Sequence, residues 1–361
     1  MRWNRWIIVT ACLVITLTIS GGCSGIEKVE RSVRQITAAE TTSETSGILE
    51  NMDQLEEAVK YMVMNHSEKE KFLMNTTDMD QVEAAIVKGV DQASLVPGYY
   101  SLVNGYGYVS SGYELTVTVE YYITKEDLVR SKEKADEVLD AIVTEEMSDY
   151  EKVLVIHDYI VNNTSYAQVF NEENLKAHTM FGVLIDGQAV CQGYTDAFHY
   201  MANKAGVRTI NVEGKADGQS HAWNMVDIDG EWYHIDTTWD DPVMETGEEI
   251  LNYDFFNVTN DEILKVHEYT VSDYPIADSS LHNYYVMTDR LVKSEKELVD
   301  RLNRLFDREE SEMEVKADFD LDESYMEKLL ESFTQGEYKT LSYSINEDSD
   351  RLWIMDVHYW D

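Results

Sequence analysis

Basic residues are scarce in this chain: 29 lysines and arginines stand against 69 aspartates and glutamates among 361 residues, for a formal net charge of −40. Nucleic-acid binding depends on neutralising phosphates, so this charge excludes a nucleic-acid partner. The same charge opposes adsorption to anionic lipid headgroups, and membrane attachment therefore requires a covalent or inserted anchor. We interpret the acidic surface chiefly as a solvating one, with recognition of a cationic partner as the alternative.

Cysteine is almost absent as well, with Cys12, Cys23 and Cys191 as its three occurrences. Once an N-terminal signal is removed, as inferred below, Cys191 is the remaining free thiol, which excludes a disulfide framework. The sequence has no Cys pair or His-x-x-x-His pattern, and it therefore predicts no metal site and no cofactor. A hydrophobic content of 43% nonetheless predicts a folded body.

An apolar run opens the chain and is too short for a comfortable membrane span. Two arginines precede residues 6–19, which are almost wholly apolar, and Gly21-Gly22 then lead into Cys23. This pattern is typical of a secretory signal and predicts that residues 1–22 are removed. The segment also resembles a bacterial lipoprotein signal, which implies that Cys23 is acylated and anchors the protein to the extracytoplasmic face of the membrane. Plain secretion and an uncleaved anchor are the alternatives.

Composition and periodicity divide the remainder of the chain into units. Residues 24–48 are rich in Ser, Thr, Glu and Gly and predict a flexible tether. Helical spacing and a stretch of period-two alternation then predict an α+β region. A capping-box pattern at 148–151 begins the central unit, and a second one at 294–297 opens a helix within the C-terminal unit. The predicted units are a signal (1–22), a tether (23–48), an N-terminal α+β region (49–147), a catalytic core (148–278) and a C-terminal α+β accessory domain (279–361).

Cys191 lies where a predicted helix begins. Apolar residues recur at helical spacing over 197–202, and Lys204-Ala205-Gly206 ends the pattern. At a helix N-terminus, the macrodipole and backbone N–H groups favour an anion, lower a thiol pKa and can stabilise an oxyanion. A buried structural cysteine is the alternative interpretation.

A predicted hairpin brings a base and a carboxylate together downstream. Asp229-Gly230 is a strong turn signal between the apolar segments 222–226 and 232–235. Such a hairpin places His221 at the start of one strand and Asp236 at the end of its partner, which makes the two neighbours. A thiol needs a base to deprotonate it and a carboxylate to orient that base, so we predict a triad of Cys191, His221 and Asp236.

Other side chains compete for these roles. Asp240 and Asp241 are alternative carboxylates, although they lie past the strand and beside Pro242. His234 shares a strand face with Asp236 and calls for a control substitution. The remaining histidines considered as weaker candidate bases are His157, His178 and His199.

Three ordered blocks resemble the bacterial transglutaminase-like superfamily: Gly187–Tyr194, His221–Asn224 and Trp232–Pro242, with support from Ile156–Tyr159 and Asn163–Tyr166. The resemblance implies an α+β, papain-like core in which a nucleophile helix packs on an antiparallel sheet, with Cys191, His221 and Asp236 as the triad. The family includes acyltransferases, peptidases, amidases and members with no known activity. Gln188 does not stand where papain-like enzymes usually carry their glutamine, so the second oxyanion donor is left unassigned.

We therefore expect an extracytoplasmic thiol enzyme that acts on amide or peptide bonds through a thioester. Its expected substrates are proteins or peptides, with cell-wall peptides suggested by the location. Hydrolysis and protein cross-linking both remain open, because the choice depends on whether the acyl site excludes water and admits an amine. The alternative class is a noncatalytic peptide-binding or scaffolding module of the cell envelope. The sequence makes no prediction of oligomeric state.

Overall fold

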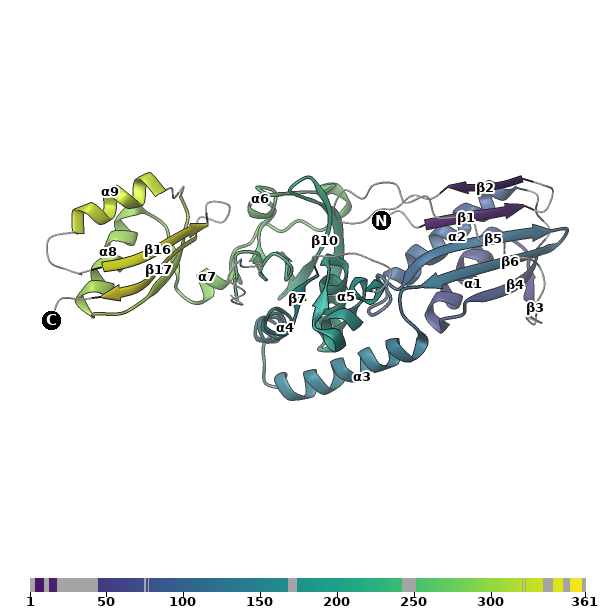
Figure 1. Cartoon of the computed structure of the whole chain (residues 1–361), viewed down its shortest axis with the longest axis horizontal. Helices are drawn as coiled ribbons and strands as arrows, with labels where there is room; N and C mark the ends of the chain where they lie inside the picture. The colour runs from purple at the N-terminus through teal and green to yellow at the C-terminus, as the bar shows by residue number, and fades with distance from the viewer. Residues whose placement is uncertain are drawn as a thin grey trace.

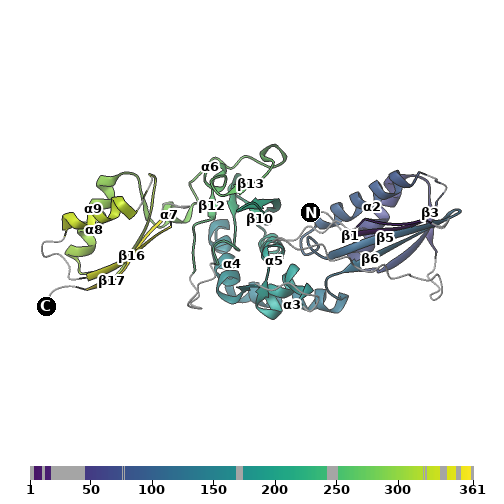
Figure 2. The ribbon, with the colours of Figure 1, turned by 45° about the horizontal axis from the view of Figure 1, so that its top comes forward.

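The computed structural model describes residues 4–9, 13–17, 45–74, 76, 78–167, 174–241, 251–319, 321, 323–333, 340–346 and 351–358. Three units follow one another along an elongated molecule, with the N-terminal unit at the right of Figure 1, the central unit in the middle and the C-terminal unit at the left. Figure 2 shows the same succession from a second direction. Cys23 lies outside the described residues.

A six-stranded sheet with the order β2-β1-β5-β6-β4-β3 forms the N-terminal unit. Thr124 and Asp127 form a capping box that begins its long helix α3, which runs along the lower edge of the molecule in Figure 1. The strands are β1 (Asn4–Val9), β2 (Leu13–Leu17), β3 (Thr45–Leu49), β4 (Lys69–Met74), β5 (Val103–Ser111) and β6 (Glu114–Tyr121), and the helices are α1 (Met52–Asn65), α2 (Met79–Ser94) and α3 (Lys125–Ile142).

The start of the chain and part of the predicted tether take strand conformation. Within the predicted signal, β1 pairs with β2 and, in parallel, with β5. Residues 45–48, at the C-terminal end of the predicted tether, belong to β3, which pairs in parallel with β4. A five-residue strand is too short for its periodicity to stand out in a polar segment. In the part of the chain that the structure describes, no helix is both long and apolar enough to span a membrane. Signal cleavage stays a prediction.

The central unit packs α5 (Cys191–Lys204) against a five-stranded antiparallel sheet with the order β12-β11-β10-β9-β13. Asp229 and Gly230 form the turn between β10 and β11 with φ values of 56° and 88°, which confirms the predicted hairpin. The sheet strands are β9 (Thr209–Ala216), β10 (Gln219–Ile228), β11 (Glu231–Ile235), β12 (Phe256–Val258) and β13 (His267–Glu268). Around them lie α4 (Asp149–Asn163), β7 (Ser165–Tyr166), η1 (Leu175–His178), η2 (Gly182–Asp186), β8 (Gln188–Ala189), α6 (Asn260–Ile263) and η3 (Val271–Asp273).

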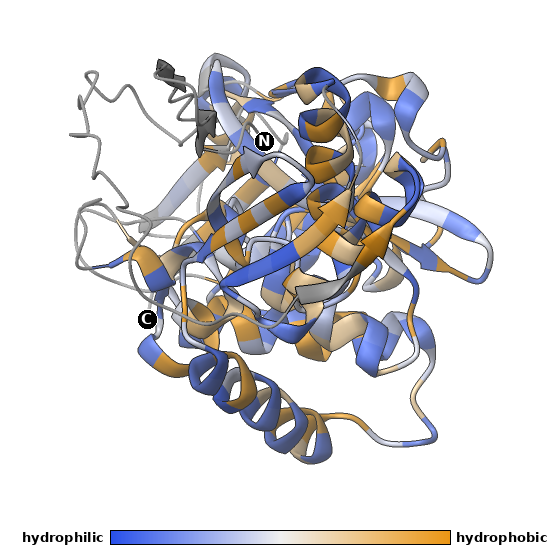
Figure 3. Cartoon of the chain, turned by 90° about the vertical axis from the view of Figure 1, so that its right-hand side faces the viewer, coloured by the Kyte–Doolittle hydropathy of each residue, from blue (hydrophilic) through white to orange (hydrophobic). Residues whose placement is uncertain are grey.

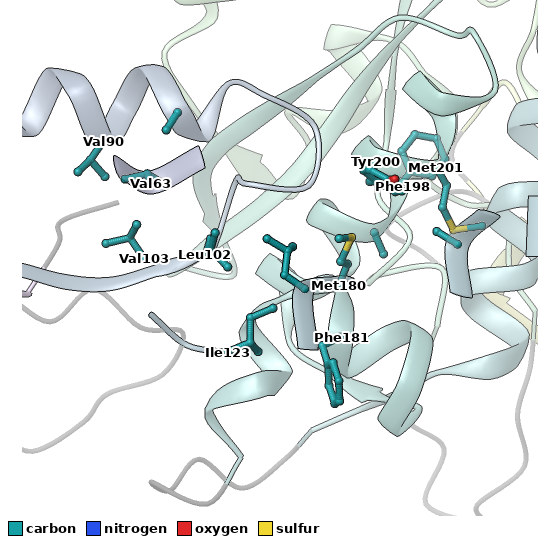
Figure 4. Close-up of a cluster of buried hydrophobic side chains, with 14 of the residues drawn as sticks. Val63, Val90, Leu102, Val103, Ile123, Met180, Phe181, Phe198, Tyr200 and Met201 are labelled. Atoms are coloured by element: carbon teal, nitrogen blue, oxygen red, sulfur yellow. The ribbon is translucent and has the colours of Figure 1, made fainter. Parts of the chain in front are cut away.

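One hydrophobic core joins the N-terminal and central units. Buried side chains from α1, α2 and the N-terminal sheet belong to the same contiguous cluster as side chains from α4, α5 and β11. Figure 4 shows Leu102 and Ile123 of the N-terminal unit beside Met180 of the central unit. At the lower edge of Figure 3, the outer side of α3 is largely hydrophilic. The two units therefore share one apolar interior instead of meeting at a solvated boundary.

The C-terminal unit has its own core and a four-stranded sheet with the order β14-β15-β17-β16. Ion pairs connect it to the central unit: Arg351 Nε lies 3.0 Å from Asp254 Oδ1, and Lys316 Nζ lies 3.0 Å from Glu262 Oε1. Its elements are β14 (Leu291–Val292), α8 (Glu295–Asp307), β15 (Met313–Ala317), α9 (Glu323–Phe333), β16 (Thr340–Asn346) and β17 (Arg351–His358), preceded by the short helix α7 (Tyr284–Met287).

Candidate active site

Cys191 is the first residue of α5 and its side chain is fully buried. The backbone of η1 lies directly against this first turn, because a Cβ on Gly193 would stand 2.5 Å from the carbonyl oxygen of Ala177. The thiol donates a hydrogen bond to Gln192 Oε1 at 3.4 Å. The position at the positive end of a helix favours a thiolate, whereas the complete burial of the side chain fits the alternative interpretation, a buried structural cysteine.

His221 lies three residues into β10, and Asp236 follows directly after β11. His221 Nε2 is 2.6 Å from Asp236 Oδ2. The hairpin therefore brings together the two residues that the sequence predicted to be neighbours. Since Nε2 is engaged by the carboxylate, Nδ1 is the ring nitrogen that can act as a base.

Asp236 accepts four hydrogen bonds. Its Oδ1 accepts the backbone N–H groups of Thr238 at 3.0 Å and Trp239 at 3.2 Å, and its Oδ2 accepts the ring N–H groups of His221 and His267, the latter at 2.9 Å. Burial favours the protonated acid, but the charge of His221 and these hydrogen bonds outweigh it and hold the pKa of Asp236 well below its ordinary value. The carboxylate is therefore a fixed anion.

His267 was missed by the sequence analysis. It lies on β13, 31 positions after Asp236, and its side chain is fully buried. No motif marks this position, and its approach to Asp236 depends on the pairing of β13 with the far side of β9. The signal that could have found it is weak: a histidine in a short segment of alternating polarity.

His221, Asp236 and His267 form a group that could hold a metal ion, with ligand atoms within 4.8 Å of one another. The separations of 2.6 and 2.9 Å between ring nitrogens and carboxylate oxygen match N–H···O hydrogen bonds. Two ligands of a tetrahedral zinc ion stand roughly 3.3 Å apart, given metal–ligand bonds of about 2.0–2.1 Å. These separations therefore fit direct hydrogen bonds between the two imidazole rings and the carboxylate better than three ligands around one metal ion.

Residues 136–237 match the family model for the transglutaminase-like superfamily. The chain contains a transglutaminase-like domain. Kyphoscoliosis peptidase of Mus musculus and that of Homo sapiens are each 29% identical over 131 residues, which span 33% of this chain and 20% of the relative. The chain thus spans about a fifth of the length of these curated relatives. A solved structure described as a crystal structure of a TGase is 17% identical with a TM-score of 0.31, covering 63% of this chain and 60% of that one.

The alternative carboxylates, Asp240 and Asp241, lie just past the matched residues and form hydrogen bonds with other partners. Asp240 Oδ2 lies 3.1 Å from His157 Nε2, and its Oδ1 accepts the backbone N–H of Phe255. Asp241 accepts a hydrogen bond from the hydroxyl of Tyr194. Asp236 is therefore the carboxylate that contacts His221. Asp240 and Asp241 instead connect the turn after β11 to α4 and α5.

Three of the other histidines are held neutral. Burial lowers the pKa values of His178, His199 and His234 to about 4 in each case. His178 stacks on Tyr122 with ring centroids 4.7 Å apart, and its hydrogen bond with Gln192 opposes the lowering of its pKa. Gln192, not the exposed Gln188, is thus the glutamine beside the thiol.

His234 holds the indole ring of Trp223, which packs on His221, instead of serving as a base. Its Nδ1 accepts the indole N–H of Trp223 at 3.0 Å, and its Nε2 lies 3.0 Å from both Asn260 Oδ1 and the Tyr269 hydroxyl. Trp223 in turn stacks on His221, with ring centroids 5.8 Å apart. His234 therefore acts on the site through Trp223.

Protonation of His234 is expected to oppose folding in mild acid. Its folded-state pKa of about 4 lies below the unfolded value near 6.5, so below that pH the unfolded chain binds a proton that the folded chain does not. Stability from this position is complete above about pH 6.5 and falls by about 1.4 kcal/mol per pH unit on the way to 4. Urea denaturation at pH 7 and pH 5 should show the wild type losing more stability than His234→Gln. Parallel losses in both proteins contradict the assignment.

The N-terminal unit also reaches the site. The Tyr100 hydroxyl donates to Glu213 Oε1 at 3.1 Å, on the strand beside β10. Burial, then the neighbouring charges of Glu213 and Cys191, raise the pKa of Tyr100 well above its ordinary value. A phenol from outside the transglutaminase-like domain thus contacts the strand that pairs with β10. The sequence carries no signal for this contact, because Tyr100 and Glu213 are 113 positions apart.

Proposed function

We propose that this protein is a thiol enzyme that cleaves or exchanges amide bonds, with Cys191 as nucleophile, His221 as base and Asp236 as the group that orients the base. The observation that carries the proposal is the 2.6 Å contact between His221 and an Asp236 held by three further N–H donors. A structural histidine does not require a carboxylate so completely fixed. Cys191 lies in the first turn of α5, a position that favours the thiolate form of its side chain.

The proposed reaction begins with transfer of the thiol proton from Cys191 to His221 Nδ1. The thiolate sulfur attacks the carbonyl carbon of a carboxamide or peptide, and the carbonyl π electrons move to oxygen to form a tetrahedral oxyanion. Collapse re-forms the carbonyl and breaks the C–N bond as His221 protonates the departing amine. Water or a second amine then attacks the thioester, gives a proton to His221 and releases the sulfur. Asp236 stabilises the imidazolium throughout without taking its proton.

The enclosure of the thiol bears on which acceptor resolves the thioester. Cys191 has no exposed surface, and the aromatic rings of Trp223 and Trp239 flank His221 at centroid distances of 5.8 and 6.2 Å. Such surroundings disfavour free entry of water and are compatible with amine transfer to a bound acceptor. Both hydrolysis and cross-linking remain within the proposal, and the acceptor is decided by assay.

The proposed location is the extracytoplasmic face of the membrane, through acylation of Cys23 after removal of residues 1–22. The apolar run that ends at Gly21-Gly22-Cys23 supports it. In that location, proteins and cell-wall peptides are the candidate substrates.

A noncatalytic peptide-binding module remains the second candidate, and the complete burial of the Cys191 sulfur is the observation that favours it. A nucleophile must meet its substrate, whereas a structural thiol need not. The enzyme hypothesis therefore requires that the residues enclosing Cys191 move apart to admit a substrate.

Alkylation tests the proposal directly. We expect iodoacetamide to label Cys191 in the full-length chain well below pH 8, since a thiolate paired with an imidazolium persists at pH values where an ordinary thiol is protonated. His221→Ala is expected to move the midpoint of labelling up towards the reference thiol pKa of about 8.5. Labelling is measured by mass spectrometry, and the extent reached under denaturing conditions gives the value for a fully accessible Cys191. A midpoint near 8.5 in both folded proteins favours the noncatalytic module.

A further inference from the structure

Two histidines share one carboxylate oxygen in this site. His221 and His267 both donate from Nε2 to Asp236 Oδ2, at 2.6 and 2.9 Å, and their ring centroids are 5.4 Å apart. The triad of the proposed function uses the first of these hydrogen bonds. The second comes from a fully buried side chain on a different strand and has no role in that mechanism.

The His267 ring is surrounded mainly by aromatic side chains and makes few polar contacts. Its imidazole packs against Trp239, Trp223 and Phe255, with centroid distances of 4.8, 4.9 and 5.5 Å. Its Nδ1 has no hydrogen-bond partner among the residues that the structure describes. An imidazole enclosed by aromatic rings is costly unless at least one nitrogen is satisfied, so the bond to Asp236 is the polar interaction that retains His267 in this place.

Gly214 provides the room for this arrangement. It lies on β9, opposite His221 of β10 and beside β13, which carries His267. A Cβ at this position would stand 2.2 Å from the carbonyl oxygen of Glu268 and 2.9 Å from the Trp223 ring. Any side chain there would push β13 or the indole away. The absence of a side chain at Gly214 thus allows the second histidine to approach the carboxylate.

We propose that His267 is a positioning residue of the active site: its Nε2–H fixes the Asp236 oxygen that orients His221 and shares part of the carboxylate charge. This inference rests on the proposed function. Asp236 Oδ1 is held by two backbone N–H groups, and His267 supplies the matching restraint on Oδ2. Because a donated hydrogen bond stabilises the carboxylate, it weakens the pull of Asp236 on a proton at His221. His221 is thereby kept able to return its proton to the leaving amine.

The consequence is measurable as a shift in the pKa of His221. Without the His267 donor, Asp236 attracts the His221 proton more strongly, and the pKa of His221 is expected to rise by roughly one unit, the size of one hydrogen bond to a charged group. Among the contacts that the structure describes, the titratable groups at the His221 ring are Asp236, at 2.6 Å, and His267, with ring centroids 5.4 Å apart. Substitution at position 267 alone leaves Asp236 in place.

The experiment compares His267→Leu with His267→Gln in the full-length chain. Leucine removes the donor, whereas the glutamine amide offers an N–H at about the position of the ring Nε2. Each protein is labelled with ¹⁵N-histidine and titrated by NMR, with the His221 signal identified by its loss in His221→Ala. We expect the His221 pKa to rise in His267→Leu and to return to the wild-type value in His267→Gln. His199→Leu, which removes another buried histidine whose side chain hydrogen-bonds with Thr209 and Asn203, is expected to leave it unchanged.

Failure of this inference is separable from failure of the proposed function. A wild-type thiol that is alkylated well below pH 8, together with an unchanged His221 pKa in folded His267→Leu, overturns the positioning role alone. An equal rise in His267→Leu and His267→Gln also overturns it, because a restored donor must restore the pKa. If the wild-type thiol titrates as an ordinary cysteine, the proposed function fails whatever the NMR comparison gives.

Discussion

Cys191→Ala is expected to reduce amide cleavage or acyl transfer by at least about 10³-fold, towards the uncatalysed background. The sulfur forms the bond to the acyl group in the proposed reaction, and no neighbouring side chain can substitute for it. The assay pairs two readouts on the full-length chain: release of amine from peptide amides, and incorporation of a fluorescent primary amine into a glutamine-containing protein. Whichever readout the wild type supports is the one in which the variant is compared.

Stability is the matched control for this loss. Cys191 is small and fully buried, so alanine removes one sulfur atom and is expected to cost about 1 kcal/mol of unfolding free energy. Urea denaturation should therefore show a folded variant. A folded Cys191→Ala protein that retains the wild-type activity excludes the thiol mechanism. Retained binding of a peptide by that variant, with no turnover in either protein, supports the noncatalytic module.

Asp236→Asn is expected to lower kcat/KM by roughly 10³- to 10⁴-fold, the scale seen when a buried orienting carboxylate becomes an amide. Both carboxylate oxygens are acceptors, one for the N–H groups of Thr238 and Trp239 and the other for His221 and His267. An amide has one accepting oxygen and one donating nitrogen. In either orientation, its NH₂ group faces two N–H donors, so the base loses its orientation or the turn loses its anchor.

The same substitution is expected to cost about 3–5 kcal/mol of unfolding free energy, as for other buried charged pairs that lose one partner. Asp241→Asn is the matched control, since it lies in the same turn and an amide oxygen can still accept the hydrogen bond from the Tyr194 hydroxyl. We expect the control to keep its activity. Asp236→Asn activity within tenfold of the wild type would contradict the assigned role of the carboxylate.

The local parts of the site could be predicted because each rests on a short sequence signal. The start of α5 at Cys191 follows from helical spacing, and the Asp229-Gly230 turn fixes the register that places His221 beside Asp236. These signals operate within about fifteen residues, the range over which propensity and turn chemistry determine structure.

The nonlocal parts could not be predicted for a physical reason. His267 reaches Asp236 because β13 pairs with β9, and nothing within β13 itself specifies that partner. Tyr100 reaches Glu213 across 113 positions of sequence through the packing of two units. The burial of Cys191 likewise results from several segments that close around it. Periodicity describes which face of an element is apolar but not which element covers that face.

The limits of the family match have a consequence for where the candidate site can be cut out of the chain. Residues 136–237 begin inside α3 and stop just after Asp236, before β13. The matched stretch contains Cys191, His221 and Asp236, but it leaves out His267, Tyr100 and the N-terminal half of the shared core. The segment that the family model recognises is thus shorter than the stretch of chain that makes the contacts of Asp236 and the shared core, and an excised fragment of residues 136–237 would lack both His267 and half of that core.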